Sequence, residues 1–346
     1  MTHTTPTTIT AQAVHQVARP SGFPSATDFT FAEHELAAPA PGEALVENLL
    51  LSVDPYHREL MDEAGLTSGA ADWSLNAPLE GRAVGRVLTS ADPGLAPGDL
   101  VQHRQGWRTH ALVRADEVRL VPRYEGVPLT AFLSTLGGTG LTAWVALTRT
   151  LRLQPGDDLF VSAAAGGVGT AAGQFARLLG ARRIVGSAGS AAKVERLVSE
   201  LGFDAAFDYH DGPVPSLLAQ AAPDGLDAAV ENVGGEHLEA AIGSLREFGR
   251  IAWVGAVAQY HSLAAPPPAP RNLFDVVGKS LRLEGVMVRN HYDAVRELED
   301  FAVPHIRSGA LVPQETVVNG FENTVEAFLG MLRGENTGKM IVRLAE

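Results

Sequence analysis

A glycine-rich stretch is the part of the sequence with the clearest chemical meaning. Residues 158–162 read Asp-Leu-Phe-Val-Ser and predict a buried strand, and residues 170–179 predict a helix. Between them, residues 163–169 read Ala-Ala-Ala-Gly-Gly-Val-Gly. Glycines let the backbone approach a phosphate group, and the helix N-terminus offers free N–H groups and a positive dipole end. The pattern A-x-x-G-x-x-G therefore favours a dinucleotide-binding turn, although similar turns also occur for packing alone.

The loop after the next predicted strand, Arg183–Gly186, bears on which dinucleotide would bind. NAD-binding proteins usually carry an acid here that binds the ribose hydroxyls. This loop has no carboxylate, and Ser187, Ser190 and Lys193 could instead bind a 2′-phosphate. The sequence therefore favours NADP(H) over NAD(H), although a lysine in the first turn of a helix is often simply solvated.

Length and composition limit the class of protein and its partners. The chain has 346 residues, enough for about two domains, and 45% hydrophobic with 19% charged residues is ordinary for a soluble protein. A net charge of −13 disfavours a nucleic-acid partner, which would need a basic face. No apolar run is long enough to span a bilayer, and residues 1–6 lack the features of a signal peptide, so we expect no membrane partner.

The sequence contains no cysteine. This excludes disulfides, thiolate zinc sites, iron–sulfur clusters and cysteine nucleophiles, and it is compatible with the cytoplasmic location that we expect. The eleven histidines are scattered without metal-binding spacing, and His103 and His110 are expected at the surface.

The pattern of apolar runs and turns predicts two kinds of domain. Roughly the first 120 residues predict a small β-barrel, with strands at 45–53, 79–88, 100–102, 107–113 and 118–121 and no long helix. From residue 128 on, helices are predicted at 129–136 and 141–147, with a glycine break at 137–140.

Strands and helices then alternate, which predicts a parallel, doubly wound α/β sheet. Beyond the glycine-rich stretch, strands are predicted at 183–186, 205–209, 226–232, 249–255 and 281–288, and helices at 191–201, 214–221 and 237–245. Residues 266–270, Pro-Pro-Pro-Ala-Pro, predict an extended linker. A helix at 324–332 and a strand at 339–344 end the chain.

Segments spread nearly from end to end carry a family resemblance: 51–56, 163–169, 186–193, 201–204, 231–235, 248–251, 259–260, 285–288, 291–292 and 334–339. Together they resemble the medium-chain dehydrogenase/reductase superfamily, and within it the zinc-independent prostaglandin, alkenal and curcumin reductases. The resemblance implies an α/β fold in which a GroES-like β-barrel catalytic domain (1–125 and 306–346) is joined to a Rossmann NADP-binding domain (126–305). It also implies a homodimer joined along the edge of the Rossmann sheet.

Two positions distinguish this chain within the superfamily. His57 stands where these reductases usually have methionine, which bears on the substrate entrance and leaves substrate choice open. Leu79-Glu80-Gly81 stands near the place where zinc alcohol dehydrogenases carry Gly-His-Glu. With no cysteine ligands either, we expect no catalytic zinc.

The resemblance implies NADPH-dependent reduction of the C=C bond of conjugated ketones and aldehydes. Hydride adds to the β-carbon and leaves an enolate, whose oxyanion needs hydrogen-bond donors. The resemblance implies Tyr56, Tyr260 and the cofactor's ribose hydroxyls as these donors; a phenol is suitable because it donates without carrying charge. Each also has a plainer interpretation: a tyrosine after Asp-Pro is often packed in a turn, and Tyr260 could be a lid residue.

The resemblance also implies which residues bind the cofactor. Those expected at the pyrophosphate are Gly166, Gly167, Val168 and Gly169; at the 2′-phosphate, Ser190, Lys193 and Tyr209; and around the nicotinamide and its ribose, Asn232, Gly255, Val257, Tyr260, Val286, Met287, Val288 and Asn336. Taken without the resemblance, most of these would be strand, core or turn residues.

Two other functions stay open at this point. One is quinone reduction, as in the neighbouring quinone oxidoreductase branch, and the other is NADPH binding without useful catalysis. The expected partner is a small conjugated carbonyl compound, but the sequence does not determine the physiological substrate or the preference between enone and quinone.

Overall fold

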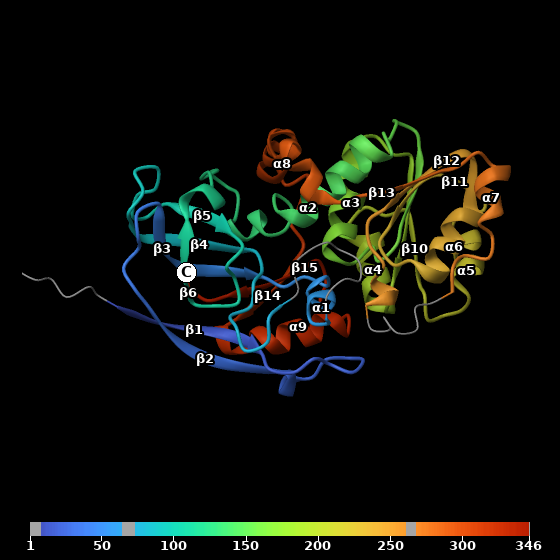
Figure 1. The fold of residues 1–346 in the computed structure, drawn as a ribbon. Coiled ribbons are helices and arrows are strands. Elements are labelled where there is room, and N and C mark those ends of the chain that lie inside the picture. Colours follow the sequence, from blue (N-terminus) through green and yellow to red (C-terminus); the bar gives the residue numbers. More distant parts are fainter. Residues whose placement is uncertain (1–7, 64–72, 261–267, 346) are drawn as a thin grey trace, which may run out of the picture. The chain divides into compact units, whose positions relative to one another are not determined.

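The computed structural model describes residues 8–63, 73–260 and 268–345 (Figure 1). The chain forms two compact units. The first comprises residues 1–133, 316–335 and 340–346, and the second comprises 134–315 and 336–339. The catalytic domain was expected at residues 1–125 and 306–346, and the NADP-binding domain at 126–305, so the bounds of the two units differ from these by several residues. In addition, the short segment 336–339 belongs to the second unit.

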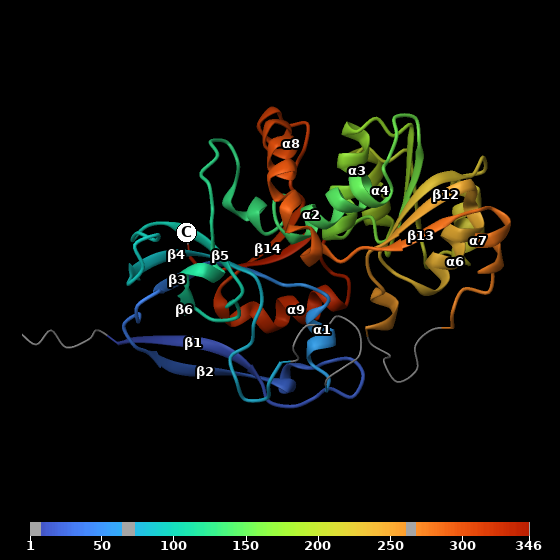
Figure 2. The ribbon, with the colours of Figure 1, turned by 45° about the horizontal axis from the view of Figure 1, so that its top comes forward.

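The first unit is built on antiparallel strands. β1 (Ile9–Gln16) and β2 (Phe29–Leu36) form a separate two-stranded ribbon (Figure 2). The main sheet has the order β14-β15-β3-β4-β5-β7, with β6 also paired to β3. Its strands are β3 (Glu43–Ser52), β4 (Ala83–Ser90), β5 (Leu100–His103), β6 (His110–Arg114), β7 (Arg119–Leu120), β14 (Glu315–Asn319) and β15 (Lys339–Arg343). The β-rich fold predicted for this part of the chain is confirmed.

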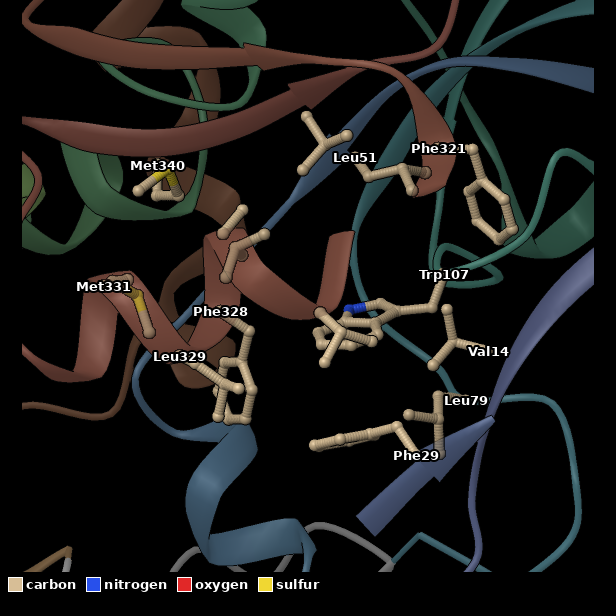
Figure 3. Packing of buried hydrophobic residues seen from close by; sticks show 14 of the residues in the cluster. Val14, Phe29, Leu51, Leu79, Trp107, Phe321, Phe328, Leu329, Met331 and Met340 are labelled. Carbon is tan, nitrogen blue, oxygen red and sulfur yellow. The ribbon is translucent and has the colours of Figure 1, made fainter. Parts of the chain in front are cut away.

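An aromatic cluster fills the core of the first unit (Figure 3). Trp107 is fully buried, and its rings meet Phe328 edge to face at a centroid distance of 5.5 Å. Phe328 lies on α9 (Thr324–Leu332), which buries Val325, Phe328 and Leu329 at helical spacing. A Cβ on Gly81 would lie 2.8 Å from the Trp107 ring, so the indole needs glycine at that position.

Two histidines are buried in the first unit. His57 opens α1 (His57–Leu60) and lies in the aromatic core, with its ring centroid 5.1 Å from that of Trp73. His103 is only 5% exposed, and burial lowers its pKa to about 3. The expectation that His103 lies at the surface was therefore wrong: alternate residues of β5 point into the core, and His103 is on that face with Val101.

The second unit is a parallel six-stranded sheet flanked by helices. The strand order is β10-β9-β8-β11-β12-β13, which in chain order reads 3-2-1-4-5-6, the arrangement of a Rossmann fold. The strands are β8 (Asp158–Val161), β9 (Arg183–Ala188), β10 (Ala205–Asp208), β11 (Leu226–Glu231), β12 (Leu245–Trp253) and β13 (Arg282–Gly285). The doubly wound parallel sheet predicted from the sequence is thus confirmed.

The helices of the second unit mostly lie where they were predicted. They are α2 (Gly138–Val145), α3 (Gly167–Leu178), α4 (Ala191–Ser199), α5 (Val214–Ala221), α6 (Gly235–Ser244), α7 (Phe274–Gly278) and α8 (Val295–Ser308). The longest of them, α8, was not predicted; it contains Pro304 and continues a 3-10 segment, Val288–Ala294. Residues 266 and 267 of the predicted proline-rich linker lie outside the described residues.

The predicted glycine break at 137–140 is wrong, because α2 begins at Gly138. A Cβ on Gly140 would collide with the carbonyl oxygen of Thr135, so glycine here permits close packing at the start of the helix. The helix predicted before it, at 129–136, is only a 3-10 turn, Leu129–Phe132.

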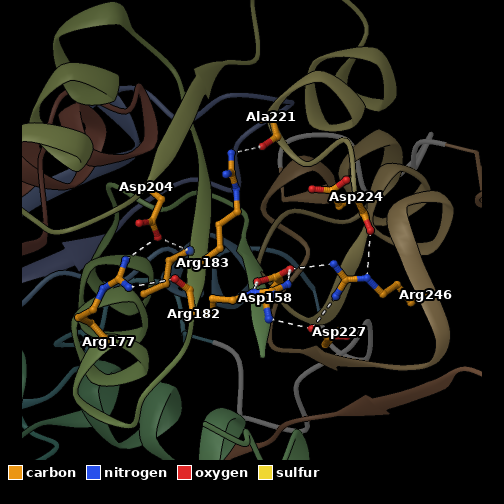
Figure 4. Close-up of polar contacts among 10 residues, drawn as sticks. Asp158, Arg177, Arg182, Arg183, Asp204, Ala221, Asp224, Asp227 and Arg246 are labelled. Carbon is orange, nitrogen blue, oxygen red and sulfur yellow. Dashed lines mark hydrogen bonds and ion pairs between the residues drawn. The ribbon is translucent and has the colours of Figure 1, made fainter. Parts of the chain in front are cut away.

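A network of ion pairs joins the amino ends of the central strands (Figure 4). Asp158, the first residue of β8, accepts two hydrogen bonds from Arg182, at 2.9 and 2.5 Å, and one from Arg246 at 2.7 Å. Arg246 also binds Asp227, 2.7 Å away, and Asp227 accepts the N–H of Asp158 at 2.8 Å. Charged side chains thus satisfy one another at this edge, which lies opposite the carboxyl ends of the strands.

We expect Asp158→Asn to lower the free energy of unfolding by about 2 kcal/mol at neutral pH, because the carboxylate is nearly buried and the substitution leaves two arginines without it. Hydrogen bonds from Arg182 lower the pKa of Asp158, so its contribution should be lost as the pH falls through that lowered pKa. Urea unfolding at neutral and acidic pH measures both effects.

The matched control is Glu200→Gln, which removes an exposed ion pair with Arg196 and should cost less than about 0.5 kcal/mol. Equal losses in the two variants would show that the Asp158 network adds nothing beyond an ordinary surface pair.

Candidate dinucleotide-binding site

The turn between β8 and α3 is tight and depends on glycine. Ala163 adopts a positive φ of 47°, and its carbonyl oxygen accepts the N–H of Gly166 at 3.0 Å. Gly166 caps the helix, which begins at Gly167. A Cβ on Gly169 would collide with the Ala163 carbonyl oxygen and would lie 2.6 Å from the Ala164 Cα. Any other residue at 169 would force the helix away from the strand end.

The N-terminus of α3 offers an anion-binding surface. The first helical hydrogen bond runs from the N–H of Thr170 to the Gly166 carbonyl oxygen, at 2.9 Å. Among the described residues, the N–H groups of Gly167, Val168 and Gly169 have no acceptor. Three free donors and the positive end of the helix dipole suit a pyrophosphate, so the residues present fit a dinucleotide.

Asn232 lies where the strand order reverses, between β8 and β11. It directly follows β11, and its side-chain amide donates to the carbonyl oxygen of Ser162 at 2.7 Å. Its N–H donates to the Ser162 hydroxyl oxygen, also at 2.7 Å. Ligands bind at such a switch point in open α/β sheets. Sequence reasoning missed Ser162, and its only signal was a small polar residue directly after an apolar strand.

The chain after β12 brings Tyr260 to the same edge. The N–H of Gly255 donates to the Glu231 carbonyl oxygen at 3.3 Å, and that of Val257 to the Asn232 carbonyl oxygen at 3.2 Å. A Cβ on Gly255 would lie 3.5 Å from the Tyr260 hydroxyl oxygen. The Tyr260 hydroxyl therefore lies beside Gly255, at the carboxyl end of β12.

The residues after β13 continue this edge of the sheet. Val286 is buried, and its N–H donates to the Trp253 carbonyl oxygen at 2.9 Å. Met287 is partly exposed, and Val288 begins the following 3-10 segment.

Three residues predicted to bind a 2′-phosphate surround the ends of β9 and β10. Ser190 caps α4 and accepts the N–H of Lys193 at 3.4 Å, and the N–H of Tyr209 donates to the Ala188 carbonyl oxygen at 3.1 Å. A Cβ on Gly189 would lie 2.8 Å from the Tyr209 hydroxyl oxygen, so Tyr209 covers this loop.

Lys193 brings a positive charge to this loop, and Asp208, the last residue of β10, brings a negative charge beside Tyr209. Burial lowers the pKa of the half-buried Lys193, and a phosphate beside it would oppose that effect. The suggestion that Ser187 also binds a phosphate is wrong, since Ser187 is fully buried and its hydroxyl oxygen accepts the Ala163 N–H at 3.3 Å.

Asn336 lies in a segment that pairs with the glycine turn. The N–H of Gly338 donates to the Ala165 carbonyl oxygen at 2.7 Å, and Gly338 forms a bridge with Gly166. The Asn336 side-chain amide donates to the Gly338 carbonyl oxygen at 2.7 Å. A segment distant in sequence thus lies against the turn, and a Cβ on Gly338 would collide with the Gln314 carbonyl oxygen.

Tyr56 belongs to the first unit, whereas all the other predicted site residues belong to the second. It directly precedes α1 and packs partly against the aromatic core. Its ring centroid is 6.0 Å from the guanidinium carbon of Arg82, within the range of a cation–π contact. Its part in catalysis stays a prediction.

Two absences hold for the part of the chain that the structure describes. It contains no group of three or more histidine, aspartate or glutamate side chains placed to hold a metal ion. In the same residues, no helix has the length and apolarity needed to cross a membrane.

The Rossmann order of the strands and the glycine turn at the switch point define the second unit as a dinucleotide-binding fold. Two family models match the chain: one described as the N-terminal domain of oxidoreductase, at residues 12–121, and one described as zinc-binding dehydrogenase, at residues 167–303.

Curated relatives match nearly the whole chain. An NADP⁺-dependent 2-alkenal reductase of Nicotiana tabacum is 34% identical over 94% of this chain and 95% of its own length. Prostaglandin reductase 1 of Rattus norvegicus is 37% identical over 93% of this chain and 95% of its own. The crystal structure of CurA from Vibrio vulnificus in complex with NADPH superposes with a TM-score of 0.90, at 29% identity, over 97% of this chain and 99% of that one. The chain belongs to the medium-chain dehydrogenase/reductase family, in its group of zinc-independent double-bond reductases.

Proposed function

We propose that this protein uses NADPH to reduce the C=C bond of α,β-unsaturated ketones and aldehydes. The observation that carries the proposal is the glycine turn after β8, where three N–H groups at the start of α3 have no acceptor among the described residues. The end of the neighbouring strand β9 has no acidic residue, which favours NADPH. The name of one relative, an NADP⁺-dependent 2-alkenal reductase, supports both the cofactor and a conjugated carbonyl substrate, since a 2-alkenal is an α,β-unsaturated aldehyde.

The chain's own residues have distinct parts in this proposal. The N–H groups of Gly167, Val168 and Gly169 bind the pyrophosphate, and Asn232, beside Ser162, and Asn336, beside Gly338, contact other parts of the dinucleotide. NADPH, when bound, supplies the hydride. The Tyr260 hydroxyl donates a hydrogen bond to the substrate oxygen on which negative charge develops, and water supplies the proton for the α-carbon.

The proposal is tested by mixing the purified protein with NADPH and a panel of enones, enals, quinones and simple aldehydes, and following the absorbance of NADPH. We expect oxidation with the enones and enals. Oxidation only with quinones would replace the proposal with a quinone reductase, and tight NADPH binding without turnover would replace it with a binding protein.

We expect Lys193→Ala to weaken NADPH binding by about 10- to 100-fold, because a charge-assisted hydrogen bond to the 2′-phosphate is lost. NADH, which lacks this phosphate, serves as the matched ligand, and the NADH affinity of Lys193→Ala should lie within about twofold of the wild-type value. Lys193→Arg should retain most of the affinity. Fluorescence titration measures all three, and an equal loss for both dinucleotides would remove Lys193 from the phosphate site.

We expect Tyr260→Phe to lower kcat by about 100-fold with little change in NADPH affinity, since one oxyanion donor is lost. Tyr292→Phe, at a half-exposed tyrosine, is the control and should leave kcat unchanged. Tyr56→Phe tests the same role for Tyr56 in the same assay. Wild-type kcat in Tyr260→Phe would exclude Tyr260 as the donor.

We further propose a homodimer joined through β13, the edge strand of the six-stranded sheet. All four residues of β13 are exposed, and apolar side chains project nearby: Phe248 is 73%, Phe274 80% and Val277 68% exposed. An exposed edge strand beside large apolar side chains is a surface that another copy of the chain would cover. A cytoplasmic location also stays a prediction, which cell fractionation tests.

Light scattering on a sizing column should give the mass of a dimer for the wild type. Phe274→Asp should shift it towards the monomer, because a charge would be buried at the contact. Leu120→Asp places the same charge on an exposed leucine of the first unit and should leave the mass unchanged. A monomeric wild type would end this proposal.

A further inference from the structure

Glu231 is a buried carboxyl group that the proposed chemistry does not use. It is the last residue of β11 and is fully buried. One carboxyl oxygen, Oε1, accepts the N–H groups of Val233 and Gly234, both at 2.7 Å. The other, Oε2, is buried and has no hydrogen-bond partner among the described residues. Because one buried oxygen lacks a hydrogen-bond donor, the charged form of this carboxyl group is destabilised relative to the neutral form.

The environment of Glu231 brings its titration near neutral pH. Burial raises the pKa of Glu231 to about 7, opposed by the hydrogen bonds from the N–H groups of Gly234 and Val233 and by the nearby Ser162 hydroxyl. None of these opposing groups carries a charge, so burial dominates.

Charged groups on the elements packed against β11 are engaged elsewhere. On α6, Glu239 pairs with Arg271, and the exposed Glu236 accepts the Val214 N–H. Burial lowers the pKa of His237, also on α6, to about 4, so this histidine is neutral near pH 7. On β12, Arg250 pairs with Asp157, and on β8, Asp158 pairs with Arg182 at the amino end of the strand.

Glu231 also connects the parts of the candidate site. Val230 lies opposite Val161 in the sheet, which places Glu231 opposite Ser162, the first residue after β8. Its side chain holds the turn that follows Asn232, and its carbonyl oxygen accepts the N–H groups of Val254 at 2.8 Å and Gly255 at 3.3 Å. The ends of β8, β11 and β12 therefore all meet at this residue.

We propose that Glu231 is a positioning residue whose carboxyl group takes up a proton when the dinucleotide binds. The proposal rests on the dinucleotide site described above. Phosphates bound at the glycine turn add negative charge near the end of the neighbouring strand, which disfavours the carboxylate. By linkage, the neutral carboxyl then favours the bound dinucleotide, so affinity is highest below the pKa of free Glu231 and falls as the pH rises through about 7.

The test is calorimetric titration of the full chain with NADPH in two buffers of different ionisation enthalpy, which counts the protons taken up on binding. Near neutral pH, the number of protons taken up per NADPH bound should be larger in the wild type than in Glu231→Gln by about 0.3 or more. Its affinity should also fall by about 10-fold more than that of Glu231→Gln across the neutral range. The 2′-phosphate titrates in both proteins, so the difference between them isolates residue 231.

Two further variants make the result specific. Glu236→Gln, an exposed glutamate on α6, should retain the wild-type proton uptake. Ser162→Ala keeps the Glu231 carboxyl but removes a hydroxyl that favours its charged form, so the pH at which NADPH affinity falls should move upward. This variant tests the proposal even if Glu231→Gln does not fold.

The outcomes separate this inference from the proposed function. Equal proton uptake in the wild type and Glu231→Gln, or an unmoved pH dependence in Ser162→Ala, would overturn the role of Glu231 while leaving the NADPH site intact. Failure of the wild type to bind NADPH at any pH would instead overturn the dinucleotide site itself.

Discussion

The start of α3 has to lie within contact distance of the end of β8, and the rest of the second unit follows from this constraint. Only a residue without a Cβ fits at 169 against Ala163 and Ala164, and the N–H groups of residues 167–169 at this strand end have no acceptor among the described residues. The segment 336–339 then pairs with the turn through Ala165 and Gly166. The tight turn thus both creates the anion-binding surface and anchors a distant part of the chain.

The two edges of the parallel sheet have different electrostatic roles. At the amino edge, Asp158, Asp227, Arg182 and Arg246 satisfy one another in an extended network. At the carboxyl edge, β8 and β11 are followed by the polar residues Ser162 and Asn232, β11 ends in the buried Glu231, and β10 ends in Asp208. At the end of β9 no carboxylate competes with an anionic ligand, which would meet the dipole and the N–H groups at the start of α3.

The first unit is held by packing of a different kind. Its aromatic core places Trp107 against Phe328, which comes from a helix more than two hundred residues further along the chain. His57 takes part in this core, so the residue that stood out in the sequence as a departure from the related reductases is a packed side chain of the first unit. Its ring meets that of the neighbouring Tyr56 at a centroid distance of 4.5 Å.

The sequence by itself determined the features that depend on local spacing. The apolar runs predicted the strands of the parallel sheet, the glycines predicted the turn, and the absence of an acid after β9 was read directly from residues 186–193. Only the tertiary structure decided what depends on distant contacts. Ser187 and His103 are buried by neighbouring strands, and Ser162 and Glu231 lie opposite each other because β8 and β11 pair, although some seventy residues separate them. Burial and pairing across the sheet are set by the whole fold, and no local pattern of residue types encodes them.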